Sequence, residues 1–439
     1  MTTNPSAAAG AATGRLSARR GPLAALRHRD FRRIWVANVV SDMGTWMQLV
    51  TVATIVARRT GSALETGLVA VATFGPQALS APIAGVMADR FERRSLYLKI
   101  LCAQTIGATV LAVAIGVGAA PRTLTLVVLG QGLVGSMANP VAAAILPELV
   151  PREDLLAASS LSSVSWNAGR IAGPMAAAAS VAAFGPTWSI VGNAVSFAVL
   201  FISVYSIKRR FPAHRGDDAG FFKRLRVGAA ALRRSPTCTF AFQASMASQF
   251  LIGPFIGLIP FYARQVLHGG QNDASILYVA MGIGALSGSL AVTTVVSRIG
   301  RPRAVVGQLV AAIMVTIGLA YAPGRALAVI GLALFGFLYI PSFVGLTSVL
   351  PRDSPPAERG RISSLFSACI GTAYSTGVVW MGAIADRTSM RTALLAGSSI
   401  LAVLLGVSVI ALNDRWRSLG RGDPASRRAV RAGLAARHH

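Results

Sequence analysis

Long apolar runs separated by short polar segments dominate the chain and predict its architecture. A helix that crosses a hydrocarbon core about 30 Å thick needs about 20 mostly apolar residues. Twelve such segments can be drawn, and the one long hydrophilic interruption falls between the sixth and the seventh. The predicted spans are 34–57, 66–87, 96–118, 123–146, 157–182, 187–207, 238–263, 274–297, 304–322, 326–349, 361–384 and 391–412. The pattern therefore predicts an all-α membrane protein with twelve transmembrane helices.

The hydrophilic interruption divides the predicted spans into two groups of six. We expect a basic cytoplasmic tail over 1–33, a six-helix bundle over 34–207, a basic cytoplasmic linker over 208–237, a second six-helix bundle over 238–412 and a second basic cytoplasmic tail over 413–439.

The two groups of spans also resemble each other in sequence. Gly75–Ser95 and Gly284–Ala304 occupy equivalent places, each ending in a short basic loop, and Arg152–Leu161 matches Ala357–Phe366. The two matches have similar offsets, 209 and 205 residues. Such internal similarity predicts a duplicated six-helix unit and hence two pseudo-symmetric bundles.

Composition and charge agree with a membrane protein and fix its expected orientation. Charged residues make up 13% of the chain, against about one quarter in average globular chains. The net charge is +26, and Lys and Arg are retained on the cytoplasmic side of membranes. With the amino terminus inside, 34 of the 42 Lys and Arg fall on the cytoplasmic side and seven on the other. We therefore expect both termini in the cytoplasm, at a cell (inner) membrane.

The basic linker and tails have an expected partner of their own. Juxtamembrane Lys and Arg are attracted to anionic lipid headgroups. A soluble nucleic-acid binder would not contain runs of twenty apolar residues, so we expect lipid headgroups and not nucleic acid as the partner.

The sequence predicts no metal, cofactor or enzymatic centre. Cys102, Cys238 and Cys369 lie inside apolar runs without CxxC spacing, and the five histidines form no cluster. There is no HExxH, no nucleophile–base pairing and no phosphate-binding loop. The missing Walker sequence excludes nucleotide-driven pumping. The first apolar run begins only near Ile34, so we expect no cleavable signal peptide.

The predicted loop between the second and third spans carries a charged motif, Gly85-Val-Met-Ala-Asp89-Arg90-Phe-Glu92-Arg93-Arg94. A glycine there lets two helices approach closely, and its carboxylate and guanidinium groups can form charge-assisted hydrogen bonds near helix ends. The motif resembles the GxxxDRxGRR signature of the major facilitator superfamily, which implies a latch that breaks and re-forms as a transporter switches sides. Glu92 stands where that family usually has Gly. The latch residues are Gly85, Asp89, Arg90, Arg93 and Arg94.

The fifth span carries a second motif, built on Gly169, Gly173 and Pro174. It resembles the GxxxGP core found in the antiporter branch of the superfamily, where it is thought to seal the cavity. Small residues could instead serve only for helix packing. In the fourth span Val128 stands where the family has an Arg often linked to proton transfer, so the proton route here is altered or moved.

Three longer stretches narrow the resemblance. Leu26–Gln48, Ala138–Leu161 and Asn167–Pro174 look like the branch that contains the enterobactin exporter and the transmembrane secretion effectors. That resemblance implies the major facilitator fold and proton-driven export of a small amphipathic substrate, such as a siderophore, a macrolide or a drug-like molecule.

Two charges lie inside predicted spans, where each costs roughly 2.5–3.5 kcal/mol at a helix centre. Asp42 is on a polar stripe of the first span, and Arg170 is in the fifth. Asp42 is expected to carry the coupled proton, unless it is a structural carboxylate. Arg170 is expected to bind an anionic substrate group, to act as the counter-charge of Asp42, or to form a fixed ion pair with it.

Other polar and aromatic side chains in the spans are candidates for the substrate cavity. Residues three and four apart share one face of a helix, and such a polar face is expected to line a cavity. Aromatic residues in spans are also common in helix packing and at membrane interfaces. The candidates are Asn38, Thr45, Trp46, Gln48, Trp166, Asn167, Gln243, Gln249 and Tyr374.

Two other functions stay open on the sequence. One is an importer or facilitator of a metabolite or lysolipid, against which the GxxxGP element argues. The other is a membrane sensor or scaffold that does not transport, for which Asp42 and Arg170 would have no use.

Overall fold

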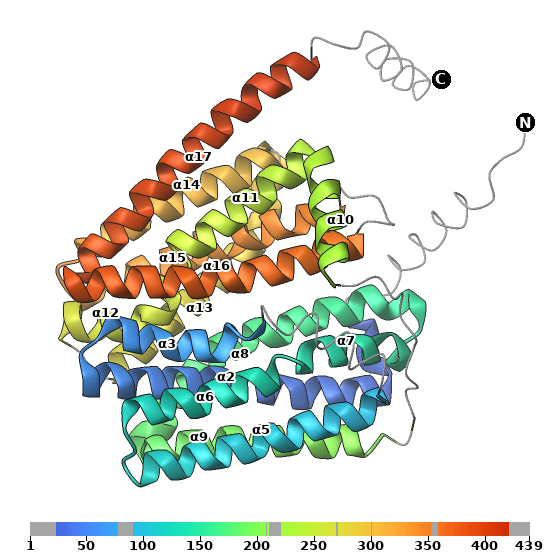
Figure 1. The fold of residues 1–439 in the computed structure, drawn as a ribbon, viewed down its shortest axis with the longest axis vertical. Helices are drawn as coiled ribbons and strands as arrows, with labels where there is room; N and C mark the ends of the chain where they lie inside the picture. Colours follow the sequence, from blue (N-terminus) through green and yellow to red (C-terminus); the bar gives the residue numbers. More distant parts are fainter. Residues whose placement is uncertain are drawn as a thin grey trace, which may run out of the picture.

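The described part of the chain is almost entirely helical. A computed structural model describes residues 23–77, 91–207, 209, 221–268, 271–299, 301–352 and 359–420, and these residues contain no β-strand. Figure 1 shows the amino-terminal helices in one layer and the carboxy-terminal helices in a second layer above it.

The amino-terminal half is organised around its first long helix. α2 packs against α8 and α9, and α5 packs against α6 and α9. The half consists of α2 (Arg29–Thr60), α3 (Ala63–Phe74), α5 (Arg93–Gly116), α6 (Pro121–Gly135), α7 (Ala138–Leu149), α8 (Leu155–Phe184) and α9 (Pro186–Tyr205), with the short 3₁₀ turns Ala24–Arg27 and Arg152–Asp154.

The carboxy-terminal half is organised around a pair of closely packed helices, α13 and α15. Glycines at their contact leave no room for a Cβ: Gly284 meets the backbone of α15, and Gly336 meets that of α13. The half consists of α10 (Phe221–Arg234), α11 (Pro236–Leu251), α12 (Phe255–Leu267), α13 (Gln271–Ile299), α14 (Arg301–Ala320), α15 (Arg325–Arg352), α16 (Arg359–Arg387) and α17 (Met390–Gly420).

These helices cover the apolar segments that the sequence predicts as spans. Nine of the described helical segments are long and apolar enough to cross a membrane. α8 and α16 are also long, 30 and 29 residues, but they carry more polar residues. α3 ends at Phe74, before a turn at Gly75 and Pro76, and residues 78–90, where the predicted second span continues, lie outside the described part. The number of crossings therefore stays a prediction.

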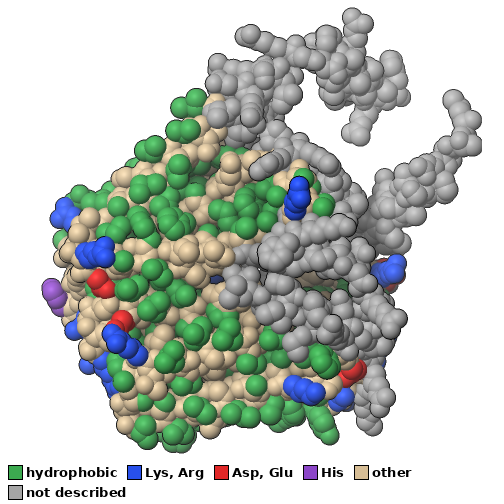
Figure 2. Space-filling view, in the orientation of Figure 1, with side chains coloured by type: hydrophobic (Ala, Val, Ile, Leu, Met, Phe, Trp, Pro, Cys, Tyr) green, Lys and Arg blue, Asp and Glu red, His purple; other side chains and the backbone are tan. Residues whose placement is uncertain are grey.

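The outer surface of the helices suits a lipid environment. Large apolar side chains are exposed along several helices, and Figure 2 shows them spread over the visible face while charged side chains gather toward its edges. Such a surface would be costly in water and is ordinary in hydrocarbon. Examples are Ile106, Val113, Leu126, Val195, Ile202, Leu290, Val403, Val407 and Ile410.

Two of the predicted spans contain a break. The fourth is interrupted between α6 and α7 at Ser136 and Met137, and the seventh between α11 and α12 at Ile252–Pro254. Proline lacks a backbone N–H and cannot continue the helical hydrogen-bond ladder, so Pro254 accounts for the second break. In transporter folds, broken helices occur where backbone lines a cavity.

The basic linker contains a helix that the sequence analysis does not predict. α10 packs against α16 and α11, and its Ala231 and Leu232 are buried while Arg226 is exposed. A short apolar face on an otherwise basic segment explains both the helix and its docking onto the bundle.

The two halves meet along α3 with α16 and along α8 with α13. At one end of this interface the Asp386 carboxylate accepts hydrogen bonds from the Ser62 hydroxyl (2.6 Å) and the backbone N–H groups of Ala63 (2.5 Å) and Leu64 (3.1 Å). Arg264 of α12 donates to the Ala57 carbonyl near the end of α2. We call this end, defined by Asp386, Ser62 and Arg264, the closed end.

Candidate functional site

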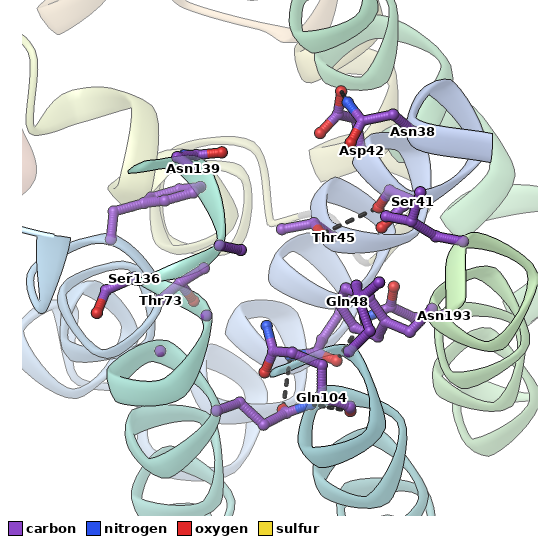
Figure 3. A pocket seen from close by; sticks show the side chains of 18 of the residues that line it. Asn38, Ser41, Asp42, Thr45, Gln48, Thr73, Gln104, Ser136, Asn139 and Asn193 are labelled. Carbon is purple, nitrogen blue, oxygen red and sulfur yellow. Dashed lines mark hydrogen bonds between the residues drawn. The ribbon is translucent and has the colours of Figure 1, made fainter. Parts of the chain in front are cut away.

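A polar cavity of about 100 Å³ lies inside the amino-terminal half, between α2, α3, α5, α6 and α9. Figure 3 shows residues of α2 on one side of it, with Ser136 and Asn139 across the cavity. Of the residues predicted to line a cavity, this one contains Asn38, Asp42, Thr45, Gln48 and Trp166. The first four of these are spaced along α2 with the helical period, which is why one stripe of sequence faces one cavity, and Trp166 reaches it from α8.

Asp42 is held by neutral hydrogen-bond donors in this cavity. The Ser165 hydroxyl of α8 donates to its Oδ2 atom at 2.5 Å, and the Asn38 amide donates to the same atom at 3.0 Å. Among the described residues no cationic side chain lies within ion-pair distance of Asp42. The other titratable residue lining the cavity is Tyr97 of α5. A carboxylate without a cation can gain or lose a proton without breaking an ion pair.

A network of amides fills the deeper part of the polar cavity. The Gln48 amide donates to Gln131 Oε1 (3.0 Å), and the Asn193 amide donates to Gln48 Oε1 (2.8 Å). Gln131 in turn donates to the Gln104 backbone carbonyl at 3.4 Å. Val128, at the position where the family has an arginine, lines the same cavity. The position of the family arginine is therefore surrounded by neutral amide side chains in this protein.

A second cavity, of about 180 Å³, lies between the two halves. We call it the aromatic cavity, because six of its thirteen lining residues are aromatic: Trp46, Phe74, Trp166, Tyr339, Phe343 and Tyr374. Trp46, Phe74 and Trp166 form one cluster with ring centroids 5.6–5.9 Å apart. Gln249, from the last turn of α11 before its break, also lines the cavity.

Arg170 contributes the charge of the aromatic cavity. Its guanidinium lies over the Trp46 ring, 5.1 Å from the centroid, which is a cation–π geometry. In the described part of the chain Arg170 forms no ion pair with Asp42. The two charges thus face different cavities in this conformation, and their contact in another conformation stays a prediction.

The glycine motif of α8 brings these two charges onto tightly packed helices. A Cβ on Gly169 would come within 2.8 Å of the Asp42 carbonyl carbon and Cβ, and one on Gly173 would meet the Trp46 Cβ and the Met43 carbonyl. Pro174 is buried inside α8 and does not end it. The small residues of the motif therefore allow α8 to contact the backbone of α2 beside Asp42.

Only part of the predicted latch can be located. Gly85, Asp89 and Arg90 lie outside the described residues. Arg93 donates to the Ala144 carbonyl (3.2 Å) and to Glu148 (3.3 Å) of α7. Arg94 donates to the carbonyls of Val204 (3.3 Å) and Tyr205 (2.7 Å) at the end of α9. Both arginines therefore tie α5 to helices of the same half.

Glu92, the departure from the family signature, has a structural use. Its carboxylate accepts a hydrogen bond from the backbone N–H of Ser95 at 2.7 Å and so caps the first turn of α5. An acidic side chain at a helix N-terminus also interacts favourably with the helix dipole. Glu92 thus caps the helix with its side chain, whereas glycine at this position would contribute only backbone flexibility.

Two candidate cavity residues lie elsewhere. Gln243 is exposed and lines a groove between α11 and α17, with Leu401 and Leu404, and not the aromatic cavity. This differs from the prediction because Gln243 and Gln249 are six residues apart, roughly 120° around a helix. Asn167 of α8 is partly buried and lines neither of the two cavities described above.

Several residues of the two cavities were not singled out from the sequence as site residues. Ser165, Gln131, Asn193 and Tyr339 each make a hydrogen bond in or beside a cavity. A polar residue in an apolar span is a usable signal, since it needs a partner there. The signal does not say which span supplies that partner.

Comparison with solved structures identifies the fold. A point mutant of the nucleoside transporter NupG matches with a TM-score of 0.70 and 15% identity, covering 87% of this chain and 99% of that one. A bacterial homologue of the human lysosomal transporter Spinster gives 0.66 and 17%, covering 90% and 99%. The D-xylose–proton symporter gives 0.67 and 12%, covering 85% and 96%. The fold is that of major facilitator transporters.

Comparison of sequences then places the chain more narrowly. The profile of the transmembrane secretion effectors matches residues 20–433, and the chain belongs to this family. It is 25% identical over 410 residues to the enterobactin exporter EntS of Shigella boydii serotype 18 and of Escherichia coli O81, covering 90% of this chain and 95% of each relative. It is thus a multi-pass membrane transporter and not an enzyme, as the sequence analysis predicted.

Proposed function

We propose that this transporter exports a small amphipathic molecule in exchange for protons, by alternating access, and that Asp42 carries the coupled proton. The observation that supports this most is the setting of Asp42. It is a carboxylate in a membrane helix, held by Ser165 and Asn38 without a cation among the described residues, and it lines a polar cavity. A charge of this kind in a span is costly and is retained for function.

The coupling follows from how protonation and substrate binding select conformations. The protonation of a carboxylate depends on how far it is removed from water, so two conformations that expose Asp42 differently differ in proton affinity. A ligand shifts such an equilibrium only through its different affinity for the two states. Exchange results when the proton favours one conformation and the substrate favours the other.

The packing of α8 on α2 supplies a physical link between the proton on Asp42 and the substrate in the aromatic cavity. Gly169 contacts the backbone of Asp42, and the next residue, Arg170, lines the aromatic cavity. A movement of α2 on protonation of Asp42 would therefore displace α8 and with it Arg170. The export direction is inferred from the relatives named as enterobactin exporters and from the GxxxGP element.

Everted membrane vesicles with an acidic interior and a pH-sensitive dye test this function. A panel of siderophores, macrolides and cationic dyes is added to vesicles containing wild type or Asp42→Asn. We expect at least one compound to accumulate inside and to release protons in wild type only, because asparagine cannot carry the proton.

Two results would contradict the proposal. One is accumulation of a compound without proton release, and the other is an Asp42→Asn variant that releases protons as wild type does. Asp273→Asn is the matched control, because Asp273 is an aspartate that pairs with Arg325 (3.1 Å) away from both cavities. It should leave both signals unchanged.

A further inference from the structure

The aromatic cavity contains an arginine whose charge is not neutralised by any residue that the structure describes. Arg170 makes no hydrogen bond or ion pair within the described residues, and its Nε atom is buried without a partner. None of the thirteen residues that line the cavity is Asp or Glu. The Arg170 side chain as a whole is half-buried, so its outer N–H groups can reach a ligand in the cavity, and a partly desolvated charge without a partner is costly.

A second buried donor in the same cavity is also unsatisfied. The indole Nε1 of Trp46 is buried and has no hydrogen-bond partner among the described residues. Trp46 and Arg170 lie on the facing helices α2 and α8, and the guanidinium covers the indole ring at 5.1 Å. Buried polar groups in folded proteins are nearly always paired, so these two unsatisfied donors of one cavity favour an acceptor from outside the described residues.

The hydroxyl groups of Tyr339 and Tyr374 on the opposite wall form no hydrogen bond with Arg170 or Trp46. Tyr339 donates its hydroxyl proton to Gln249 Oε1 at 2.5 Å, so this pair of side chains is satisfied within the carboxy-terminal half. The donors of Arg170 and Trp46 are therefore available to a ligand that offers negatively charged oxygen.

The remaining walls are suited to a flat ring. The cluster of Trp46, Phe74 and Trp166 forms the amino-terminal wall, and Tyr339 and Phe343 stack with centroids 6.2 Å apart on the carboxy-terminal wall. Aromatic rings favour offset-stacked and edge-to-face contacts with other rings. A planar substrate group can therefore contact both halves at once.

We propose that the transported molecule carries an anionic oxygen group next to a flat aromatic ring, with the anion bound by Arg170 and the Trp46 indole and the ring held between the aromatic walls. This inference rests on the proposed function, since it names the substrate class of the same transporter. The proposed function requires only that the substrate is amphipathic. The present inference adds that the substrate is negatively charged.

Equilibrium binding of four matched probes to the purified, detergent-solubilised full chain tests the proposal. The probes are 2-naphthoate, the neutral 2-naphthylmethanol, the cationic 2-naphthylmethylammonium and the ring-saturated decahydronaphthalene-2-carboxylate. Hydrogen bonds to charged groups are stronger than those to neutral groups, so we expect 2-naphthoate to bind about ten-fold or more tightly than the neutral probe. The cationic and the saturated probes should bind more weakly than 2-naphthoate.

Substitutions of Arg170 test whether the preference for the anionic probe arises in the aromatic cavity. In Arg170→Gln the ten-fold preference for the anion should be lost, and in Arg170→Lys, which keeps the charge without the planar fork, it should be partly retained. Arg391→Gln is the control, because Arg391 lies over the Tyr321 ring at 3.8 Å, outside the cavity. It should bind the probes as wild type does.

Several outcomes would overturn the proposal. The first is that wild type binds 2-naphthoate no more tightly than the neutral or the cationic probe. The second is that wild type binds the saturated acid as tightly as 2-naphthoate. The third is that the preference for the anion survives in Arg170→Gln. The probe series on wild type tests the proposal even if the Arg170 variants do not fold. Failure of proton coupling in the vesicle experiment would leave this binding preference unchanged, so the two failures can be told apart.

Discussion

Asp42 and Arg170 share a helix contact but serve different cavities. Asp42 faces the polar cavity, where its partners are Ser165 and Asn38, and Arg170 faces the aromatic cavity, where it covers Trp46. The sequence places both charges in spans and predicts the polar stripe around Asp42, because spacing along one helix is a local property. It does not predict Ser165 as the partner, since the rotation of α8 against α2 depends on packing between distant segments.

Gly169 is the residue at which this packing can be tested. An added methyl group would come within 2.8 Å of Asp42 backbone and Cβ atoms. Overpacking of this kind typically costs about 1–3 kcal/mol, so Gly169→Ala should lower the thermal unfolding midpoint of the purified protein and reduce proton-coupled transport.

Gly130→Ala is the matched control on α6. A Cβ at Gly130 meets nothing within 4 Å, and alanine favours a helix over glycine by about 1 kcal/mol. Its unfolding midpoint should be unchanged or raised. Equal midpoints for the two variants would show that α8 does not contact α2 as described.

At the scale of elements, the helix ends explain how the two halves hold together. The N-terminus of a helix has unpaired N–H groups and a partial positive charge. Asp386 of α16 satisfies two of these N–H groups on α3, while Arg264 of α12 binds a carbonyl of the last turns of α2. The carboxy-terminal half thus places an acid and a base on opposite sides of the α2–α3 turn, each where the helix dipole favours it.

Removing the charge of Asp386 should therefore loosen the closed end. An anion at a helix N-terminus contributes about 0.3–1 kcal/mol, so Asp386→Asn should raise the population of conformations open at this end about two- to five-fold. Spin labels on Arg58→Cys and Thr388→Cys, in a background without native cysteines, report that population as longer distances.

Asp273→Asn provides the comparison for the closed end, since Asp273 pairs with Arg325 within the carboxy-terminal half. It should leave the distance distribution unchanged. A distribution that is the same in Asp386→Asn as in wild type would show that this contact does not hold the halves together.

The elements themselves were largely predictable, and the exceptions have physical causes. Each predicted span coincides with at least one helix, because a run of apolar residues needs no knowledge of its neighbours. The break at Ile252–Pro254 and the helix α10 were not predicted. The break depends on the local effect of Pro254 inside an apolar run, and α10 depends on a short apolar face that only docking onto α16 and α11 makes useful.

At the scale of the whole molecule, the two halves surround the aromatic cavity and contribute different side chains to it. Both Asp42 and Arg170 belong to the amino-terminal half, and the carboxy-terminal half contributes a neutral wall with Tyr339 and Gln249. The distribution of Lys and Arg predicts that both termini and the basic linker face the cytoplasm. The closed end would then face outward.

Labelling of single cysteines by a membrane-impermeant maleimide in intact cells checks this orientation. In a background without native cysteines, Thr388→Cys in the α16–α17 turn should be labelled directly, and Arg209→Cys after α9 should be labelled only once the membrane is permeabilised. The reverse pattern would place the termini outside and overturn the predicted direction of transport.

Proton release on substrate binding tests the central claim most directly. The purified protein is mixed, in weakly buffered solution with a pH indicator, with a compound that accumulates in the vesicle experiment. The account predicts that binding to wild type and to Asp273→Asn releases protons, and that binding to Asp42→Asn releases none while the compound still binds. Equal proton release from wild type and Asp42→Asn would contradict it.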